Sequence, residues 1–94
     1  MNSVVIFDVN IRHQEVKNAM MALGYFAGWN ANNNLYYLPH NTLWRLNIEQ
    51  ANSLAEIQGV IVRLNSTVGA QQIVLQRCIV LPVNPWAGIQ GVPI

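Results

Sequence analysis

The chain has 94 residues, of which 52% are apolar and only 10% are charged, and its formal net charge at pH 7 is +1. A chain of this size allows one domain. Its small net charge provides no electrostatic field that would attract nucleic acid, and no apolar run reaches the ~18 residues of a membrane span. The single cysteine, Cys78, excludes an internal disulfide and predicts a reducing, cytoplasmic location.

The first part of the chain predicts a strand followed by a helix. Residues 3–9 form a short, nearly continuous apolar run, which is typical of a buried strand. Asn10 is a favourable helix N-cap, and Gly24 supplies the left-handed conformation that ends a helix. Between them the apolar residues repeat at helical spacing: Val16, Ala19, Met20 and Leu23. We therefore expect a helix between Asn10 and Gly24.

The middle of the chain predicts an antiparallel hairpin. Residues 25–29 read as extended chain, and residues 30–34 form a polar turn region rich in asparagine. Residues 35–38 are expected to form a strand. A tight connection at residues 39–41 would then lead into its antiparallel partner, residues 42–46.

A second helix is predicted to begin at Asn47. Gln50 follows three residues later, which gives a capping-box pattern with asparagine in the place of serine or threonine. Residues 66–69 end the helix. Its core stripe is expected to consist of six apolar residues: Ile48, Ala51, Leu54, Ile57, Ile61 and Leu64.

The last strand is predicted over residues 72–81, and both of its faces are mainly apolar. Alternation places one set of side chains on one face, namely Ile73, Leu75, Arg77, Ile79 and Leu81. The other face then carries Val74, Gln76, Cys78 and Val80. Two helices cover only one face of a single antiparallel sheet, so the other face is expected to meet another copy of the chain.

The order of these elements predicts the fold class. Strand, helix, strand, strand, helix and strand is the order of an α+β, ferredoxin-like β-α-β-β-α-β sandwich, which we expect over residues 1–82 as a homo-oligomer with the second sheet face at the subunit interface. The tail, residues 83–94, contains Trp86 and hardly any charge. We expect it to dock on its own or on an adjacent subunit, because a free tail would expose apolar surface.

Asp8 is the candidate for metal chemistry. It ends the first predicted strand, and with the helix that follows, this region resembles the nuclease-like proteins of CRISPR adaptation and their toxin–antitoxin relatives. Residues 41–44 and 85–88 extend that resemblance. It implies a dimer in which two copies of Asp8 hold a divalent metal. The alternative is that Asp8 satisfies backbone groups at the strand–helix junction, which we prefer because one carboxylate per chain is a thin magnesium site.

Two other segments resemble a different family. The segments NIRH (residues 10–13) and GYFAG (residues 24–28), with residues 42–46 and the helix after them, are similar to the phage S-adenosylmethionine lyases. That resemblance implies a PII-type trimer with active sites between subunits. It also implies a reaction without a metal or cofactor, in which S-adenosylmethionine is degraded to methylthioadenosine and homoserine lactone.

Such a site needs aromatic faces for the adenine ring and the sulfonium. Tyr36, Tyr37 and Trp44 cluster on the predicted hairpin. We therefore expect Tyr36 and Trp44 to bind an adenosine-containing small molecule and Tyr37 to act in catalysis. The alternative is that these aromatic side chains are core or interface residues.

The resemblance also implies that a glutamate usually lies near the cationic centre, whereas the polar residue inside the last strand is Gln76. Either the site lies elsewhere, or Gln76 marks an inactive variant of a catalytic glutamate. Arg77 is a candidate carboxylate or phosphate clamp, with an ion pair to a glutamate at the interface as the alternative. His40 and Asn41 in the predicted turn are candidate ligand contacts, with plain surface as the alternative.

Three functional classes follow. The first is a small-molecule enzyme or binding protein with a site between subunits, acting on S-adenosylmethionine. The second is a dimeric, metal-dependent nuclease-like or nucleic-acid-associated protein centred on Asp8. The third is a non-catalytic regulatory or sequestering oligomer.

Overall fold

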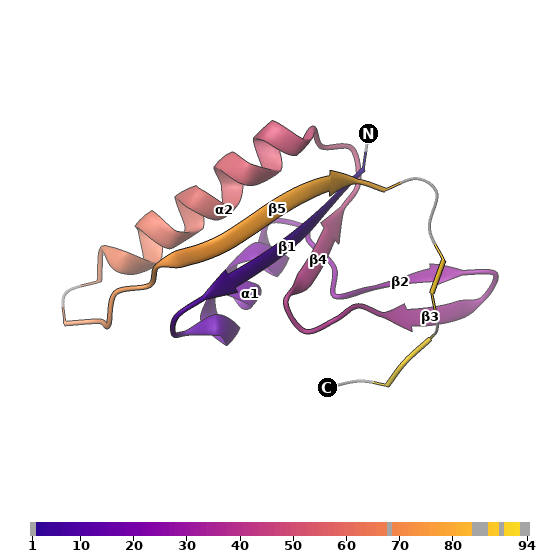
Figure 1. Ribbon diagram of the computed structural model, residues 1–94, viewed down its shortest axis with the longest axis horizontal. Coiled ribbons are helices and arrows are strands. Elements are labelled where there is room, and N and C mark those ends of the chain that lie inside the picture. Colours follow the sequence, from indigo (N-terminus) through magenta and orange to yellow (C-terminus); the bar gives the residue numbers. More distant parts are fainter. Residues whose placement is uncertain (1, 68, 84–86, 89, 93–94) are drawn as a thin grey trace.

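The computed structural model describes residues 2–67, 69–83, 87–88 and 90–92. Within these ranges the chain forms a small α+β domain with a three-stranded sheet, a two-stranded sheet and two helices (Figure 1). The elements in chain order are β1 (Ser3–Val9), α1 (His13–Ala22), β2 (Gly28–Ala31), β3 (Asn34–Tyr37), β4 (Thr42–Arg45), α2 (Gln50–Asn65) and β5 (Leu75–Pro82).

The three-stranded sheet has the order β4-β1-β5, and β1 is antiparallel to both neighbours. Val5 lies opposite Leu43 on β4 and Val80 on β5, so these side chains share the inner face of the sheet. Both helices pack on this inner face. The buried cluster between sheet and helices consists of Val5, Phe7, Val16, Met20, Tyr25, Leu43, Ile57, Val60, Ile61 and Ile73.

The predicted pairing of residues 35–38 with residues 42–46 is wrong. Strand β3 pairs with β2 to form a separate hairpin, whereas β4 pairs with β1. Asn32 and Asn33 form the hairpin turn with φ angles of 51° and 65°, and two consecutive residues of positive φ match the twist of a tight hairpin. The isolated bridge between Phe26 and Trp44 is the contact that joins residue 26 to the edge of β4.

Both helices begin two residues later than predicted, because their N-caps are Arg12 and Glu49 and not Asn10 and Asn47. Helix α1 starts at His13, after Arg12, whose φ angle is 59°. The Asn10 side chain does not cap it: its Oδ1 accepts from Val74 N at 2.7 Å and thereby ties the end of β1 to the segment before β5. Helix α2 starts at Gln50, because Glu49 is extended and Asn47 has a left-handed φ of 55°.

The buried face of α2 is rotated from the predicted stripe. Ile57 and Ile61 are buried as expected, whereas Ala51 and Leu54 are exposed. Ser53 takes their place in the interior with no exposed surface. A serine can occupy this position because its Oγ lies 2.9 Å from the Tyr25 hydroxyl, which satisfies the buried polar group.

A β-bulge near the start of β5 changes which face its side chains occupy. Asp8 lies opposite Arg77, but Val9 lies opposite Leu75, so Gln76 is the extra residue. Leu75 therefore packs against the buried cluster, while Arg77 lies on the outer face beside Asp8. The predicted common face of Leu75 and Arg77 is wrong, because strict alternation assumes an unbroken ladder.

The outer face of the sheet is apolar on β1 and β5 and lies away from the helices. Val4 and Ile6 lie opposite Leu81 and Ile79. The side chains of Ile79 and Leu81 are 53% and 42% exposed. This is the second apolar face expected from the strand patterns, and its coverage by another copy remains a prediction. No helix in the described ranges has the length and hydrophobicity needed to cross a bilayer.

Candidate functional site

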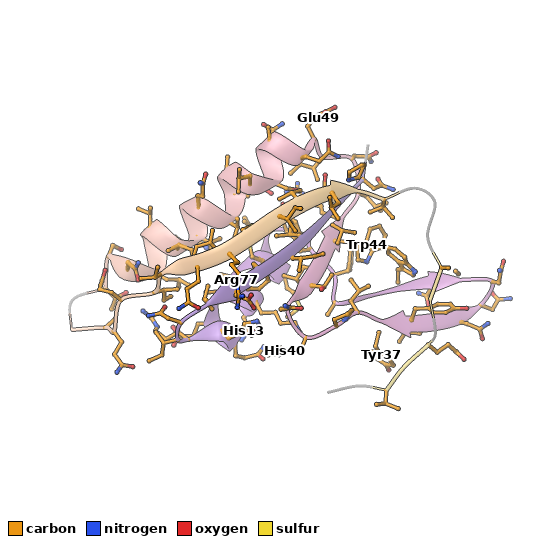
Figure 2. The ribbon with its side chains drawn as sticks, in the orientation of Figure 1. His13, Tyr37, His40, Trp44, Glu49 and Arg77 are labelled. Atoms are coloured by element: carbon orange, nitrogen blue, oxygen red, sulfur yellow. The ribbon has the colours of Figure 1, made fainter. Side chains whose placement is uncertain are left out.

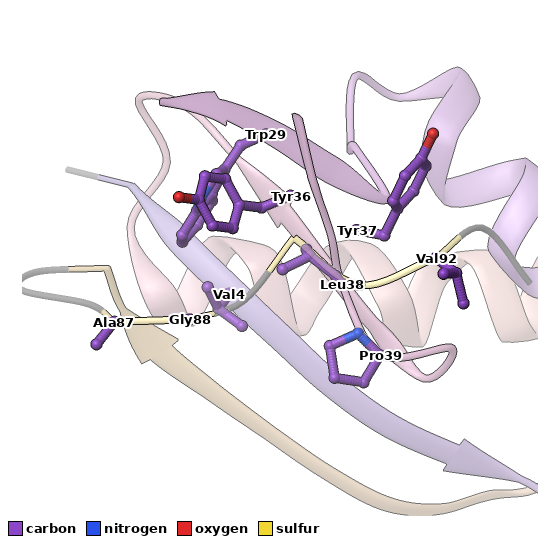
Figure 3. A pocket seen from close by; sticks show the side chains of 10 residues that line it. Val4, Trp29, Tyr36, Tyr37, Leu38, Pro39, Ala87, Gly88 and Val92 are labelled. Carbon is purple, nitrogen blue, oxygen red and sulfur yellow. The ribbon is translucent and has the colours of Figure 1, made fainter. Parts of the chain in front are cut away.

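The candidate site is a pocket of about 510 Å³ where the β2–β3 hairpin leaves the sheet, and we call it the hairpin pocket (Figure 3). Its walls come from three parts of the chain that are distant in sequence. They are Val4 of β1, residues of the hairpin and its exit, and residues of the tail. The lining residues are Val4, Trp29, Tyr36, Tyr37, Leu38, Pro39, Ala87, Gly88, Gly91 and Val92.

The hairpin geometry places two aromatic side chains together. Trp29 and Tyr36 are directly opposite across β2 and β3, so their side chains lie on the same face of the hairpin. Figure 3 shows both rings on one side and the Tyr37 ring pointing away from them. The strands approach closely at Gly28, where a Cβ atom would lie only 2.7 Å from the Tyr36 carbonyl oxygen. Glycine is therefore required beside this pair.

The tail supplies the other wall of the hairpin pocket. The Tyr37 backbone N–H donates to the Gln90 carbonyl oxygen at 2.9 Å, which places residue 90 alongside β3. Gly91 adopts a φ of 69°, a conformation that favours glycine. Trp86, which the sequence indicated as an apolar tail residue, lies outside the described residues, as does Pro85.

Trp44 lies beside the hairpin pocket rather than in its lining. Its Nε1 donates to the Gly28 carbonyl oxygen at 2.8 Å. Its ring meets Trp29 edge-on, with centroids 5.1 Å apart, and lies 5.5 Å from the ring of Phe26. Trp29 and Trp44 together line a second hollow of about 300 Å³.

Sequence reasoning missed Trp29, although it is the aromatic residue shared by both hollows. The sequence pattern places it in extended chain before a turn region. The signal that identifies it is the Asn32-Asn33 pair, since a two-residue turn there places Trp29 opposite Tyr36. The predicted trio therefore divides: Tyr36 and Tyr37 line the hairpin pocket, and Trp44 supports the base of the hairpin.

The polar candidates lie at the other end of the outer face. Arg77 Nε lies 2.8 Å from Asp8 Oδ2, so Arg77 pairs with Asp8 rather than with a glutamate. Asn41 Nδ2 lies 3.5 Å from Asp8 Oδ1. Val4, which lines the hairpin pocket, and Asp8 are four residues apart on β1, a separation of ~13 Å along the strand. In the view of Figure 2, the stacked rings of His13 and His40 lie apart from Trp44.

Two histidines, one of which interacts electrostatically with Asp8, stack on each other. The ring centroids of His13 and His40 are 4.1 Å apart, with 25° between the ring planes. Burial lowers the pKa of His13, the neighbouring His40 and Lys17 lower it further, and Asp8 opposes them. In the described part of the chain no group of three His, Cys, Asp or Glu side chains gathers in a way that could hold a metal ion.

Gln76, the other predicted catalytic residue, is exposed in the bulge and does not line the hairpin pocket. Arg45 forms an ion pair within the chain, with its Nη1 2.7 Å from Glu56 Oε1. The Tyr25 hydroxyl donates to the same oxygen at 2.7 Å, and burial raises the pKa of Tyr25 to about 12. Glu56 is thus committed to a structural network.

The pocket residues within the described ranges include no glutamate or other charged side chain. What they offer is an apolar enclosure with aromatic faces, which suits an uncharged ring rather than an ion. Comparison of the chain with protein-family models, with curated proteins and with solved structures gives no match.

Proposed function

We propose that the hairpin pocket binds the adenine-bearing end of an adenosine-containing small molecule. The ligand that we propose is S-adenosylmethionine, which the resemblance of residues 10–13 and 24–28 suggests. The observation that carries the proposal is the pairing of Trp29 with Tyr36 in a pocket of about 510 Å³. Small-molecule sites have volumes of ~300–1,000 Å³ and are lined mainly by apolar and aromatic residues.

The chemistry of the lining favours a neutral, flat ring. An aromatic face stabilises a stacked base and a nearby sulfonium cation, and the lining offers aromatic faces without a charged competitor. The amino-acid end of the ligand is charged, so in this proposal it lies outside the apolar enclosure. Its carboxylate and ammonium would need polar partners from the surface or from another copy of the chain.

The proposed reaction is intramolecular. An oxygen of the substrate's carboxylate attacks the γ-carbon of the same molecule. The bond between the γ-carbon and sulfur breaks, and its electron pair goes to sulfur. Methylthioadenosine leaves and homoserine lactone remains. The protein's contribution would be to fold the methionine portion into attack geometry and to keep water away.

The site is proposed to be completed by another copy of the chain. The order β4-β1-β5, with Phe26 bridged to the edge of β4, supports a ferredoxin-like sandwich whose fourth strand is reduced to one bridge. Ile79 and Leu81 provide exposed apolar surface on the face away from the helices. We propose that this face meets other copies in a trimer, and that the trimer supplies the carboxylate that the described pocket lining does not contain.

The test is ligand binding by calorimetry with S-adenosylmethionine, methylthioadenosine and adenosine. Tyr36→Leu keeps an apolar side chain and removes the aromatic face. We expect it to weaken binding roughly 5- to 150-fold, which corresponds to the ~1–3 kcal/mol of one base-stacking contact. Leu35→Ala is the matched control, because Leu35 is the neighbouring residue on β3 and is not part of the pocket lining. Absence of binding by all three ligands at millimolar concentration would refute the proposal.

Turnover is tested separately, by chromatography of methylthioadenosine. Gln76→Glu is expected to create or raise lyase activity if Gln76 replaces a catalytic glutamate. Because Gln76 lies outside the hairpin pocket of its own chain, that result also requires the trimer. If both the wild type and Gln76→Glu bind S-adenosylmethionine and neither forms methylthioadenosine, the non-catalytic, sequestering alternative is favoured.

The Asp8 alternative has less support. Arg77 already neutralises the Asp8 carboxylate at 2.8 Å, and a divalent metal would have to displace it. Mg²⁺-dependent cleavage of DNA or RNA that is lost in Asp8→Ala would reverse this ranking.

A further inference from the structure

The Phe7, His13 and His40 rings form a stack that joins three parts of the chain. The His13 ring lies 5.2 Å from the Phe7 ring with 9° between their planes, and 4.1 Å from the His40 ring with 25° between them. Phe7 belongs to β1, His13 is the first residue of α1, and His40 lies in the connection between β3 and β4. The stack therefore attaches residues 39–41 to the body of the domain.

The same connection is hydrogen-bonded to the sheet and forms part of the hairpin pocket. The Phe7 N–H donates to the Asn41 carbonyl oxygen at 3.0 Å, and the Thr42 N–H donates to the Pro39 carbonyl oxygen at 2.9 Å. Pro39 also lines the hairpin pocket. Movement of this short connection would thus change a wall of the pocket.

The surroundings of the stack disfavour positive charge on it. Lys17 Nζ donates to the His40 carbonyl oxygen at 3.2 Å, so one cation already lies beside the pair. His13 Nε2 is buried and has no hydrogen-bond partner. Of the carboxylates, Asp8 is paired with Arg77 on β5, and Glu15 of α1 is paired with Arg12. Neither is a full counter-ion for a protonated His13 ring.

We propose that protonation of His13 in mild acid releases residues 39–41 from α1 and opens the hairpin pocket. Positive charge on the His13 ring is disfavoured by His40, whose ring centroid lies 4.1 Å away, and by the nearby Lys17. The connection is the element free to move, because His13 is held within a helix while His40 is exposed. Only the effect on ligand binding rests on the proposed function.

The direction of the pH dependence follows from His13. Its pKa in the folded chain is lowered from 6.5 by burial, by His40 and by Lys17. The released form therefore binds protons more readily than the stacked form. The stabilisation by the stack is complete above the ordinary histidine pKa and is lost as the pH falls through the lowered pKa of His13.

The experiment is nuclear magnetic resonance of the full chain between about pH 8 and pH 5, which follows the histidine ring protons and amide hydrogen exchange. Once corrected for the intrinsic pH dependence, exchange of the Phe7 and Thr42 amides is expected to accelerate as the pH falls, because the lowered pKa of His13 makes proton binding favour the released form. The Ile73 amide, bonded to Asn65 Oδ1 at 2.8 Å, is the internal control and should not change.

His40→Phe is the matched variant, because it keeps a ring in the stack and removes the charge. In it the His13 pKa should rise toward its ordinary value, and the Phe7 and Thr42 amides should stay protected in acid. His40→Gln removes both the ring and the charge, and it gives a second test if the phenylalanine variant does not fold. Acid-accelerated exchange that is identical in the wild type and in a folded His40 variant would overturn the proposal. Because no ligand is used, this result is independent of whether adenosine binds.

Discussion

Gly28→Ala tests whether the hairpin pocket depends on the close approach of β2 and β3. The added Cβ atom would lie 2.7 Å from the Tyr36 carbonyl oxygen, a main-chain atom that cannot rotate away. Bringing that contact to an ordinary 3.4 Å requires the strands to separate by about 0.7 Å. Because Trp44 Nε1 holds the Gly28 carbonyl oxygen at 2.8 Å, the separation displaces Tyr36 relative to Trp29.

The cost of this overpacking is ~1–3 kcal/mol, the range for one inserted methyl group in a packed site. The free energy of unfolding of a small domain is ~5–15 kcal/mol, so the variant should remain folded. The hairpin also lies outside the buried cluster of sheet and helices. We therefore expect the geometry of the pocket to change more than the global stability does. If the whole cost lowered the free energy of unfolding, Tm would fall by ~4–8 °C per kcal/mol, and we expect a smaller fall.

The assay combines thermal unfolding with near-ultraviolet circular dichroism, which reports the surroundings of the aromatic side chains, including the cross-strand pair of Trp29 and Tyr36. We expect the aromatic signal of Gly28→Ala to change and adenosine binding to weaken. Gly59→Ala on α2 is the matched control, because its Cβ atom would meet nothing within 4 Å. That helical substitution should raise stability by ~0.5–1 kcal/mol and leave the aromatic signal unchanged. An unchanged aromatic signal and Tm in Gly28→Ala would refute the reasoning.

Two further substitutions test the framework that supports the site. Tyr25→Phe removes the hydroxyl that donates to Glu56 Oε1 at 2.7 Å, so urea unfolding should show a loss of ~1–3 kcal/mol. Because burial raises the Tyr25 pKa from 10.0 to about 12, the folded wild type should also lose stability as the pH rises through that range, and Tyr25→Phe should not; equal losses would contradict the assignment. Asn65→Ala removes the bonds from its Nδ2 to the Ile73 carbonyl oxygen at 2.9 Å and from the Ile73 N–H to its Oδ1 at 2.8 Å. We expect ~1–3 kcal/mol of destabilisation and faster exchange of the Ile73 amide, and an unchanged unfolding midpoint would count against this role.

Local patterns predicted most of the regular elements. The apolar run at residues 3–9 is β1, and Gly24, predicted to end the first helix, has a left-handed φ of 105°. The second helix ends at Asn65, where residues 66–69 were expected to stop it. These features depend on a residue and its near neighbours, so the sequence contains the information needed to find them.

The candidate site was less predictable. The sequence predicts Tyr36 and Tyr37 as aromatic site residues, and both line the hairpin pocket. It does not indicate Trp29, which also lines the pocket, and the predicted Trp44 lies at the base of the hairpin. The predicted catalytic partner Gln76 lies in the bulge of β5, outside that lining. Aromatic content can be read from composition, whereas membership of one pocket depends on which strands pair.

The sequence by itself determined that the chain forms one small α+β domain with a strand–helix beginning and an apolar final strand, because hydrophobic periodicity and glycine conformation are local properties. Only the tertiary structure decided that residues 42–45 pair with β1 and not with residues 35–38. It also decided that the bulge places Arg77 on the same face as Asp8. Strand pairing is a competition among distant segments with similar local preferences. Its outcome depends on which arrangement buries the most apolar surface while satisfying the backbone hydrogen bonds.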